Sequence, residues 1–453
     1  MLLKPQLFGT DGVRGVAGRY PLDRETIVKL GGSLGLVLIS EAQSRRPEVL
    51  LGLDTRESGP WIARSLAAGL RASGAEVAYA GVTTTPGVAF LTRHHGFAAG
   101  VMVSASHNPF QDNGIKVFSG EGAKLLETVE VEIERALLQG FPVAGIEDVE
   151  LKITTGLLDE YLDFLESLAP PGGYVSSLRL VVDCGNGSAS AVAPELFRRL
   201  GINARLMNAQ PDGRNINLNC GSLYPEAMAQ EAQSAGADLG VAFDGDADRA
   251  IFAANSGRIL DGDHVLFGMA PYLKANSLLK GRAVVGTLMT NLGLELALKS
   301  HGIGLKRTAV GDKFVLEEML RSGINLGGEP SGHIIFSDVS PAGDGFVTLI
   351  EMLRLMAGTG KPADELVRNY TPFPQLIRNV AVQEKPPLES VPEVAGALAR
   401  CEDEMKGRGR VVLRYSGTEP LARVMVEGDR AAAVERHATE IAAAIEKTLG
   451  TRV

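Results

Sequence analysis

The sequence has few of the residues that would tie it to an oxidising compartment, to nucleic acid or to a lipid surface. It has three cysteines in 453 residues, Cys184, Cys220 and Cys401. No CxxC spacing predicts zinc and no cysteine framework predicts disulfides. Aromatic residues make up 5% of the chain, so its cores must consist of aliphatic side chains. The net charge of −9 gives no general attraction for nucleic acid or anionic lipid. We therefore expect no nucleic-acid partner and no membrane partner.

Long apolar runs and nucleotide-binding loops are missing as well. The longest nearly apolar stretch, residues 30–39, is shorter than the roughly 20 residues of a membrane-spanning helix. Residues 1–12 lack the apolar stretch of a signal peptide. Residues 358–362 (GTGKP) place proline after the lysine, so they do not form a P-loop, and no GxGxxG pattern occurs. These features predict a cytoplasmic protein with reduced thiols.

The pattern of apolar segments predicts several α/β units. The length favours three or four domains. Short apolar strands alternate with helical patterns, which predicts parallel α/β layering; the clearest strands are 49–53, 178–183, 239–243 and 283–287. Residues 169–177 and 369–374 have the composition of linkers. The chain after them reads strand, helix, strand, loop, strand, helix, which predicts a separate α+β module.

Three carboxylates follow the apolar strand at 239–243. Asp244, Asp246 and Asp248 stand at every second position of the segment DGDADR, where their oxygens can converge on one hard cation. An EF-hand is excluded, because Arg249 and Asn255 stand where its glycine and glutamate are required. Magnesium suits the cluster best, because three carboxylates leave coordination positions for a phosphate oxygen and water. Manganese and calcium remain alternatives.

A serine-rich loop follows the strand at 99–103. Ser104, Ser106 and His107 lie in the segment VSASHNPFQDNGIKVF. A serine here can act as a nucleophile, and an ordinary capped loop serine is the alternative. The GxSxG pattern of a hydrolase elbow is absent. Lys116, in the same segment, is a candidate proton donor or phosphate partner, with a solvated lysine as the alternative.

Three further loops carry polar groups at close spacing. The segment GGEPSGH (327–333) offers donors and acceptors suited to sugar hydroxyls. The segment RYSGTEPLAR (414–423) offers hydroxyls, backbone amides and two arginines, which suits a dianion. The segment FGTDGVRG (8–15) is a glycine-rich loop that carries Arg14. Each is also compatible with a plain turn.

Together these loops suit phosphoryl transfer on a phosphorylated sugar, and the missing ATP loop favours a mutase over a kinase. The motifs FGTDGVRG, SASHNP, DGDADR, GEPSGH and RYSGTEP occur in that order. In this ordered set the chain resembles the α-D-phosphohexomutase superfamily along its whole length. The resemblance implies a four-domain α/β architecture, with three mixed α/β domains and a C-terminal α+β domain like the TATA-binding protein. The boundaries we predict are 1–155, 156–255, 256–368 and 369–453.

The resemblance also implies roles for individual residues. Ser106 is expected to be a phosphoserine whose oxygen, with Asp244, Asp246 and Asp248, holds one Mg²⁺ per chain. The residues expected to line the phosphoryl site are Arg14, His107, Lys116 and Arg249, with Lys116 as candidate general acid/base. Those expected to bind the sugar are Glu329, Ser331 and His333. Those expected to hold the non-reacting phosphate are Arg414, Ser416, Gly417, Thr418 and Arg423.

Within the superfamily, the N-terminal motif, the segment 219–222 (NCGS) and the segment 414–428 resemble the branch that acts on glucosamine phosphates. That likeness implies interconversion of glucosamine 6-phosphate and glucosamine 1-phosphate through a 1,6-bisphosphate, as a supply for UDP-N-acetylglucosamine synthesis. Pro330 is a departure, because this branch commonly has glutamine there. Activity on glucose or mannose phosphates is the nearest alternative. A phosphosugar-binding protein without catalysis and a metal-dependent phosphatase are others. A homodimer is compatible with the resemblance, and Ser106 must first be phosphorylated by a kinase or by the bisphosphate as primer.

Overall fold

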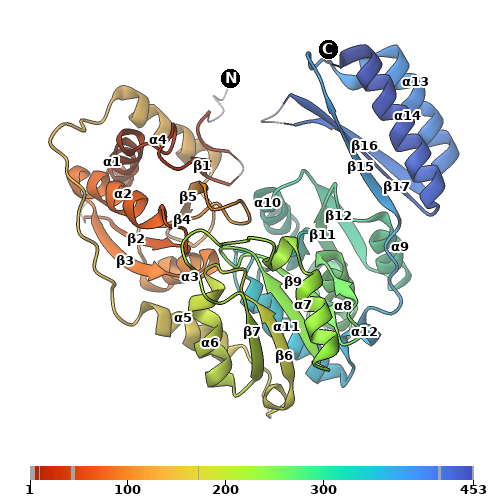
Figure 1. Cartoon of the computed structure of the whole chain (residues 1–453), viewed down its shortest axis with the longest axis horizontal. Helices are drawn as coiled ribbons and strands as arrows, with labels where there is room; N and C mark the ends of the chain where they lie inside the picture. The colour runs from red at the N-terminus through yellow and green to blue at the C-terminus, as the bar shows by residue number, and fades with distance from the viewer. Residues whose placement is uncertain (1–5, 10, 42–45, 172, 417–419, 451–453) are drawn as a thin grey trace.

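The computed structural model describes residues 6–9, 11–41, 46–171, 173–416 and 420–450. Within them, four sheets follow one another along the chain, each with its own helices, and they define four α/β units. Figure 1 shows the first three units along an arc and the fourth beside the third. Among these residues, no helix combines the length and the apolar character needed to cross a lipid bilayer.

The first unit is a five-stranded mixed sheet between two layers of helices. Its strands lie in the order β1-β5-β4-β2-β3; they are β1 (Val13–Val16), β2 (Glu48–Leu53), β3 (Glu76–Val82), β4 (Ala99–Val103) and β5 (Asp112–Ser119). β2 runs parallel to β3 and β4, whereas β5 runs antiparallel to β4 and β1. One face packs on α1 (Arg24–Glu41), α2 (Gly59–Ser73) and α4 (Glu127–Gln139), and the other on α3 (Thr85–His95).

The second unit repeats this design. Its sheet has the order β10-β9-β8-β6-β7, built from β6 (Arg179–Asp183), β7 (Asn203–Met207), β8 (Leu239–Phe243), β9 (Ala250–Ala254) and β10 (Ile259–Leu260). α5 (Leu157–Ser167) and α6 (Ala189–Leu200) cover one face, and α7 (Glu226–Ser234) covers the other. Single 3₁₀ turns form at Val175–Ser177 and Gly221–Leu223.

The third unit has a four-stranded sheet of order β12-β11-β13-β14. Its strands are β11 (Ala283–Thr287), β12 (Gly304–Thr308), β13 (Leu326–Gly328) and β14 (Ile334–Phe336). Its helices are α8 (Gly262–Ala275), α9 (Leu292–Ser300), α10 (Asp312–Ser322), α11 (Gly345–Thr359) and α12 (Ala363–Leu366), with a 3₁₀ turn at Lys280–Arg282. α10 packs on one face of the sheet, while α8 and α11 pack on the other.

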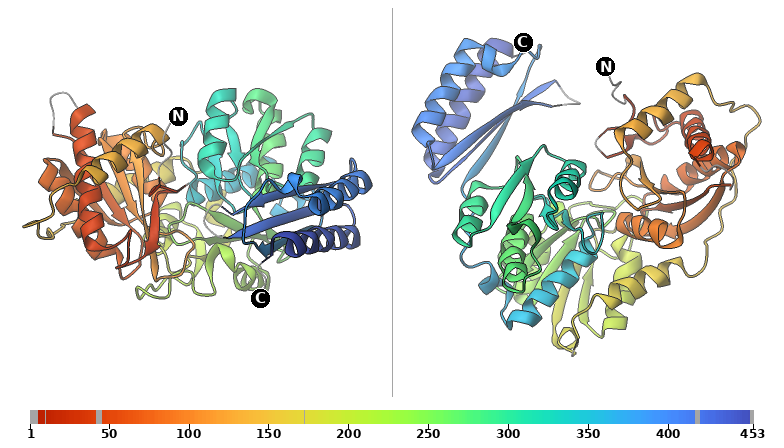
Figure 2. Two further views of the ribbon diagram at one scale, coloured as in Figure 1. Left: turned by 90° about the horizontal axis from the view of Figure 1, so that it is seen from above. Right: turned by 180° about the vertical axis from the view of Figure 1, so that it is seen from behind.

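The fourth unit is an antiparallel sheet of order β15-β17-β16 covered by two helices. Its elements are β15 (Gln375–Ala381), a 3₁₀ turn at Leu388–Ser390, α13 (Pro392–Met405), β16 (Gly409–Tyr415), β17 (Leu421–Gly428) and α14 (Ala431–Leu449). This is the order of strands and helices that the sequence predicts for the tail. Both figures show the unit beside the third unit and away from the second (Figures 1 and 2).

The first three units share a large hydrophobic core, whereas the fourth unit has a separate one. The largest cluster of buried residues runs without a break from the first unit through the third, and includes Leu50, Leu162, Phe243 and Leu353. The fourth unit has a cluster of its own, with Val394, Val424 and Ile441 among its members. Hydrogen bonds join the fourth unit to the third: Leu292 donates its backbone N–H to Oε1 of the fully buried Glu427 at 3.0 Å.

The sequence-based expectations differ from the structure in three ways. The expected mixed α/β architecture is confirmed, but the parallel layering inferred from the alternation holds only for part of each sheet. In the first two units, the last strands return antiparallel to their neighbours. The segment around Lys116, which the sequence predicts to be a loop, forms the interior of β5. The sequence also does not predict α3 or α8, because the first turn of each contains glycine or proline, which are poor helix formers.

Candidate active site

Ser106 lies in the loop between β4 and β5, at the edge where the first unit meets the second. Its backbone has a φ of 53°, a left-handed conformation that is uncommon for a residue with a side chain. Its hydroxyl donates to Oδ2 of Asp244 at 2.5 Å and lies 3.3 Å from Nδ1 of His107. Its backbone N–H donates to Oγ of Ser104 at 2.9 Å. The candidate nucleophile is therefore held against the carboxylate cluster that the sequence predicts to bind metal.

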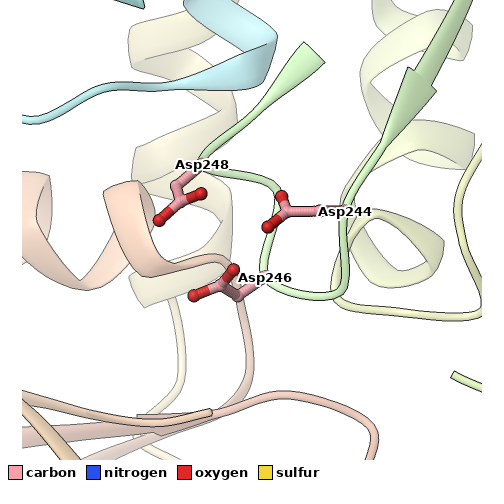
Figure 3. A group of neighbouring side chains, drawn as sticks. All are labelled: Asp244, Asp246 and Asp248. Carbon is pink, nitrogen blue, oxygen red and sulfur yellow. The ribbon is translucent and has the colours of Figure 1, made fainter. Parts of the chain in front are cut away.

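The three aspartates follow β8 and are all buried. One oxygen from each lies within 4.8 Å of the others, and Figure 3 shows the carboxylates around one small space. Oδ1 of Asp246 and Oδ1 of Asp248 have no hydrogen-bond partner among the described residues. Burial and the neighbouring charges of Asp248 and Asp246 raise the pKa of Asp244 well above its ordinary value. Closely spaced carboxylates with unsatisfied oxygens fit a hard divalent cation such as Mg²⁺.

Lys116 projects from β5 into this cluster. Its Nζ lies 2.8 Å from Oδ2 of Asp246, 3.2 Å from Oδ2 of Asp248 and 3.0 Å from Oδ2 of Asp11. Burial opposes the charge on Lys116, but these three carboxylates outweigh it and raise its pKa well above the ordinary value. A protonated lysine therefore stands among the candidate metal ligands.

Two histidines near the cluster have opposite charge states. Burial and the positive charges of Arg249 and Arg14 lower the pKa of His107 to about 4, so this ring is neutral at pH 7. His333 is also buried, but its contact with Asp248 outweighs the burial and raises its pKa to about 9. The site thus contains one neutral imidazole beside Ser106 and one imidazolium, from the third unit, beside Asp248.

The segment 327–333 forms a hairpin between β13 and β14. The backbone N–H of Glu329 donates to the carbonyl of His333 at 2.9 Å, which closes the turn. Oε1 of Glu329 accepts from the backbone N–H of Gly311 at 3.0 Å. The buried hydroxyl of Ser331 has no partner among the described residues. Glu329 and His333 therefore line the cleft with a carboxylate and a cation, which suits sugar hydroxyls.

A cavity of about 480 Å³ lies between these groups. Its lining comes from the first three units and includes Arg14, His107, Asp248, Arg249, Glu329 and His333. It therefore brings together residues from four of the five motifs. The cavity is large enough for a monosaccharide phosphate and is walled by both charge signs.

The fifth motif lies apart, on the fourth unit. Arg414 and Arg423 stand directly opposite each other on β16 and β17. The C-terminal end of β16 and the N-terminal end of β17 point toward the first unit (Figure 1). Burial and the charge of Arg423 lower the pKa of Arg414. Ser416, which directly follows β16, is buried. Gly417 and Thr418 lie outside the described residues.

The sequence does not predict three charged residues of the cleft, Asp11, Lys124 and Asp312. Lys124 lies 2.5 Å from Oδ1 of Asp11 and 2.7 Å from Oδ2 of Asp312, which joins the first unit to the third. Asp312 also lies 3.5 Å from Nε2 of His333. Asp11 stands within the motif that carries Arg14, but nothing in the sequence pairs it with a lysine 113 positions later.

The sheet order and the site define an α/β phosphotransferase, in which a serine contacts a carboxylate cluster beside a polar cleft. Comparison with known proteins gives its family. The sequence matches the four phosphoglucomutase/phosphomannomutase domains: α/β/α domain I at residues 5–141, domain II at 159–257, domain III at 261–373 and the C-terminal domain at 378–444. The chain belongs to the phosphoglucomutase/phosphomannomutase family.

The similar proteins agree with this placement. A phosphoglucosamine mutase from Solibacter usitatus is 49% identical over 98% of this chain and 99% of its own. One from Deinococcus radiodurans is 44% identical over 98% of both chains. A phosphoglucomutase/phosphomannomutase family protein from Burkholderia thailandensis has the same fold, with a TM-score of 0.77 at 23% identity over 97% of both chains. N-acetylphosphoglucosamine mutase from Aspergillus fumigatus, solved with GlcNAc-6P and magnesium, has a TM-score of 0.66 at 18% identity over 92% of this chain and 96% of its own.

Proposed function

We propose that this chain is an isomerase of the phosphohexomutase type that interconverts glucosamine 6-phosphate and glucosamine 1-phosphate. The observation that carries the proposal is the 2.5 Å hydrogen bond from the Ser106 hydroxyl to Asp244 within the carboxylate cluster. The choice of sugar rests on the curated relatives, which are named phosphoglucosamine mutases at 40–49% identity over nearly the whole chain. In this role the enzyme feeds UDP-N-acetylglucosamine synthesis.

In the proposed cycle, phosphorylated Ser106 transfers its phosphoryl group to glucosamine 6-phosphate. The resulting glucosamine 1,6-bisphosphate turns around in the cleft and returns its other phosphoryl group to the serine, which releases glucosamine 1-phosphate. Asp244, Asp246 and Asp248, with a phosphoserine oxygen, would hold one Mg²⁺. When bound, that ion neutralises charge on the transferring group.

The basic groups of the cleft have distinct parts in this cycle. Protonated Lys116 lies among the acidic groups, where it can neutralise charge or donate a proton. His107 is neutral, so its ring nitrogen beside Ser106 can accept a proton. Arg14 and Arg249 contribute positive charge at the reacting phosphate.

Two further groups of residues would hold the substrate. Glu329, Ser331 and His333 would bind the sugar hydroxyls from the hairpin of the third unit. The set proposed to grip the non-reacting phosphate is Arg414, Ser416, Gly417, Thr418 and Arg423. A grip separate from the serine allows either end of the bisphosphate to be held while the other end reacts.

Three experiments test the proposal. The first measures the product from glucosamine 6-phosphate with trace bisphosphate and Mg²⁺, for wild type and Ser106→Ala. We expect isomerisation by the wild type, and loss of at least about 10³-fold in the variant because the covalent carrier is gone. Full turnover by Ser106→Ala would sink the phosphoserine mechanism. Net release of inorganic phosphate would indicate a phosphatase, and tight binding without turnover would indicate a phosphosugar-binding protein.

The second experiment removes divalent ions with a chelator. We expect turnover to disappear and to return on addition of Mg²⁺, because Asp246 and Asp248 hold unsatisfied buried oxygens that the cation would neutralise. The third experiment compares glucosamine, glucose and mannose phosphates. A strong preference for glucosamine supports the proposed substrate, whereas comparable turnover on all three would favour a general phosphoglucomutase/phosphomannomutase, the alternative that Pro330 keeps open.

The remaining parts of the proposal concern assembly, first phosphorylation and location. We propose that Ser106 is first phosphorylated by a kinase or by glucosamine 1,6-bisphosphate; intact-mass measurement before and after incubation with the bisphosphate tests the second route. A homodimer is proposed, and sedimentation velocity tests it. Cytoplasmic location is supported by three free, buried thiols, Cys184, Cys220 and Cys401, which suit a reducing compartment.

A further inference from the structure

The backbone of the Ser106 loop is held by side chains from two different units. We infer that Arg56 of the first unit and Asn217 of the second form a clamp on this loop. The clamp acts on backbone carbonyls rather than on the reacting hydroxyl, so both are positioning residues. The catalytic consequence of the clamp rests on the proposed function of Ser106, whereas its effect on the loop does not.

Arg56 forms the first half of the clamp. Its side chain is fully buried and its Nε donates to Oδ2 of Asp54 at 2.9 Å. The two terminal nitrogens donate to four backbone carbonyls, three in the loop, of Ser106 (2.8 Å), Asn108 (2.8 Å) and Pro109 (2.5 Å), and that of Asp112 (3.0 Å), the first residue of β5. A guanidinium whose two terminal nitrogens bind four neighbouring carbonyls fixes the shape of this segment more tightly than a single contact can.

Asn217 forms the second half. Its Nδ2 donates to the carbonyl of Ser106 at 2.9 Å and to that of Asn108 at 3.2 Å. These are two of the four carbonyls that Arg56 binds, so each receives one donor from the first unit and one from the second. Asn217 itself is buried, has a φ of 57°, and donates its backbone N–H to the carbonyl of Gly185 at 2.8 Å.

Gly245 ties this clamp to the carboxylate cluster. It stands between Asp244 and Asp246, and a Cβ at this position would lie 2.5 Å from the carbonyl oxygen of Ser106 and 2.9 Å from Nδ2 of Asn217. The space that a side chain would need is occupied by the clamped carbonyl and its donor. Position 245, between the first two aspartates, is therefore glycine because the clamped carbonyl and its donor leave no room for a side chain.

The clamp explains how Ser106 keeps an unfavourable backbone. A residue with a side chain adopts φ near +53° only where the surroundings hold it there. The carbonyl of Ser106 is the atom that both donors share, and the hydroxyl of the same residue contacts Asp244. Loss of one donor should let the loop relax, and the hydroxyl would then move away from the carboxylates.

Asn217→Gly tests this directly, because glycine accepts the same φ and removes only the side-chain donor. Asn219→Gly is the matched control: Asn219 has a φ of 52°, lies two positions away and is exposed. The first measurement is amide hydrogen exchange of residues 104–111, which needs no substrate. The second is kcat and KM for glucosamine 6-phosphate with saturating Mg²⁺ and bisphosphate.

We expect Asn217→Gly to speed exchange in residues 104–111 and to lower kcat by about 10- to 100-fold, since small misplacements of reacting groups cost that much. KM should stay within about 2-fold, because the sugar and phosphate contacts are elsewhere. Asn219→Gly should match the wild type in both measurements. Unchanged exchange in Asn217→Gly, or a loss confined to KM, would overturn the clamp.

A second pair of variants tests the contribution of Arg56 to the clamp. Arg56→Lys keeps the charge but loses the fork that reaches several carbonyls. Arg354→Lys is its control, because Arg354 pairs with Glu351 on its own helix and donates to the carbonyl of Leu168 in the second unit, away from the Ser106 loop. We expect faster exchange of the Ser106 loop only in Arg56→Lys, and equal exchange in both variants would contradict the inference. A wild type inactive on glucosamine phosphates, with faster exchange in Asn217→Gly, would refute the proposed function and leave the clamp standing.

Discussion

Replacing Gly262 with alanine should displace the hairpin of residues 327–333, which we propose to bind the sugar, while leaving the serine and the carboxylate cluster in place. Gly262 is the first residue of α8, and its N–H donates to the carbonyl of Pro330 at 3.1 Å. A Cβ here would lie 2.0 Å from the carbonyl oxygen of Glu329, whereas Cβ atoms keep at least 3.0 Å from such neighbours. The obstacle is backbone, so it cannot rotate aside. The hairpin must move by about 1 Å, and overpacking of this kind typically costs about 1–3 kcal/mol.

That shift should appear in catalysis more than in stability. A displacement of about 1 Å in a positioning group costs roughly 10²-fold in rate, so we expect kcat/KM for glucosamine 6-phosphate to fall by about that factor. The Mg²⁺ concentration for half-maximal activity should not change, because Asp244, Asp246 and Asp248 are on the second unit. The assay is steady-state turnover at several concentrations of substrate and Mg²⁺.

Gly268→Ala is the control on the same helix. Its Cβ would meet the flexible end of Leu355 at 3.3 Å, so the variant should fold and turn over like the wild type. Glycine to alanine also favours a helix, so helix propensity cannot account for a loss in Gly262→Ala. An unchanged kcat/KM in Gly262→Ala, or an equal loss in Gly268→Ala, would refute the steric reasoning.

Three further predictions concern stability and reactivity. Burial raises the pKa of Asp344 to about 6, above 3.8 in the unfolded chain, so this carboxyl favours folding when protonated and costs stability as the pH rises through that window. In the wild type this carboxyl should lower the free energy of unfolding by about 3 kcal/mol between pH 4 and pH 7, and Asp344→Asn should abolish that contribution. Urea titrations of the variant that show the same pH dependence as the wild type would contradict this. The thiols are buried and their pKa values are raised, to about 12 for Cys220 and about 11 for Cys401, so a disulfide reagent at pH 8 should titrate three thiols only after unfolding. Lys124→Met removes the cation shared by the partly buried Asp11 and Asp312 and should destabilise the protein by about 2 kcal/mol in thermal unfolding. Lys29→Met loses one ion pair, with the exposed Glu25, and should cost less than about 1 kcal/mol; equal shifts would argue against a stabilising role of Lys124.

The sequence identifies the parts of the site that follow apolar strands. Ser106 comes after β4 and Asp244 after β8, and such positions lie at the edge of a sheet where loops from different units meet. The expectation that these residues belong to one site needs only the strand pattern and the order of the motifs. The 2.5 Å contact between them agrees with it.

Residues whose local sequence indicates a different structure from the one they adopt could not be found this way. Asn113-Gly114 is typical of a turn, yet both residues lie inside β5. Gly114 is needed there because a Cβ would lie 2.6 Å from the carbonyl oxygen of Ser104. Since the strand was not evident, neither was the placement of Lys116 against the carboxylates. The sequence alone does not distinguish a glycine required by packing from one required by a turn.

Arg56 and Asn217 show a second limit. Each acts on the Ser106 loop, from 50 and 111 positions away. Apolar periodicity reports which face of an element is buried, but it does not report which polar groups meet between units. Arg56 stands in a polar loop, where an arginine is ordinarily solvated, and only the fold shows that it is fully buried and bound to four carbonyls.

The unequal division of the cores has a consequence for how this protein unfolds. Three units share one continuous cluster of buried side chains, so the loss of any of them exposes apolar surface on the others, and they should behave as a single cooperative block. The fourth unit keeps its own cluster and is joined to the third by hydrogen bonds of Glu427 and Arg410. Its melting need not disturb that block. Damage to the fourth unit would therefore leave a folded remnant that still holds the serine and the carboxylates.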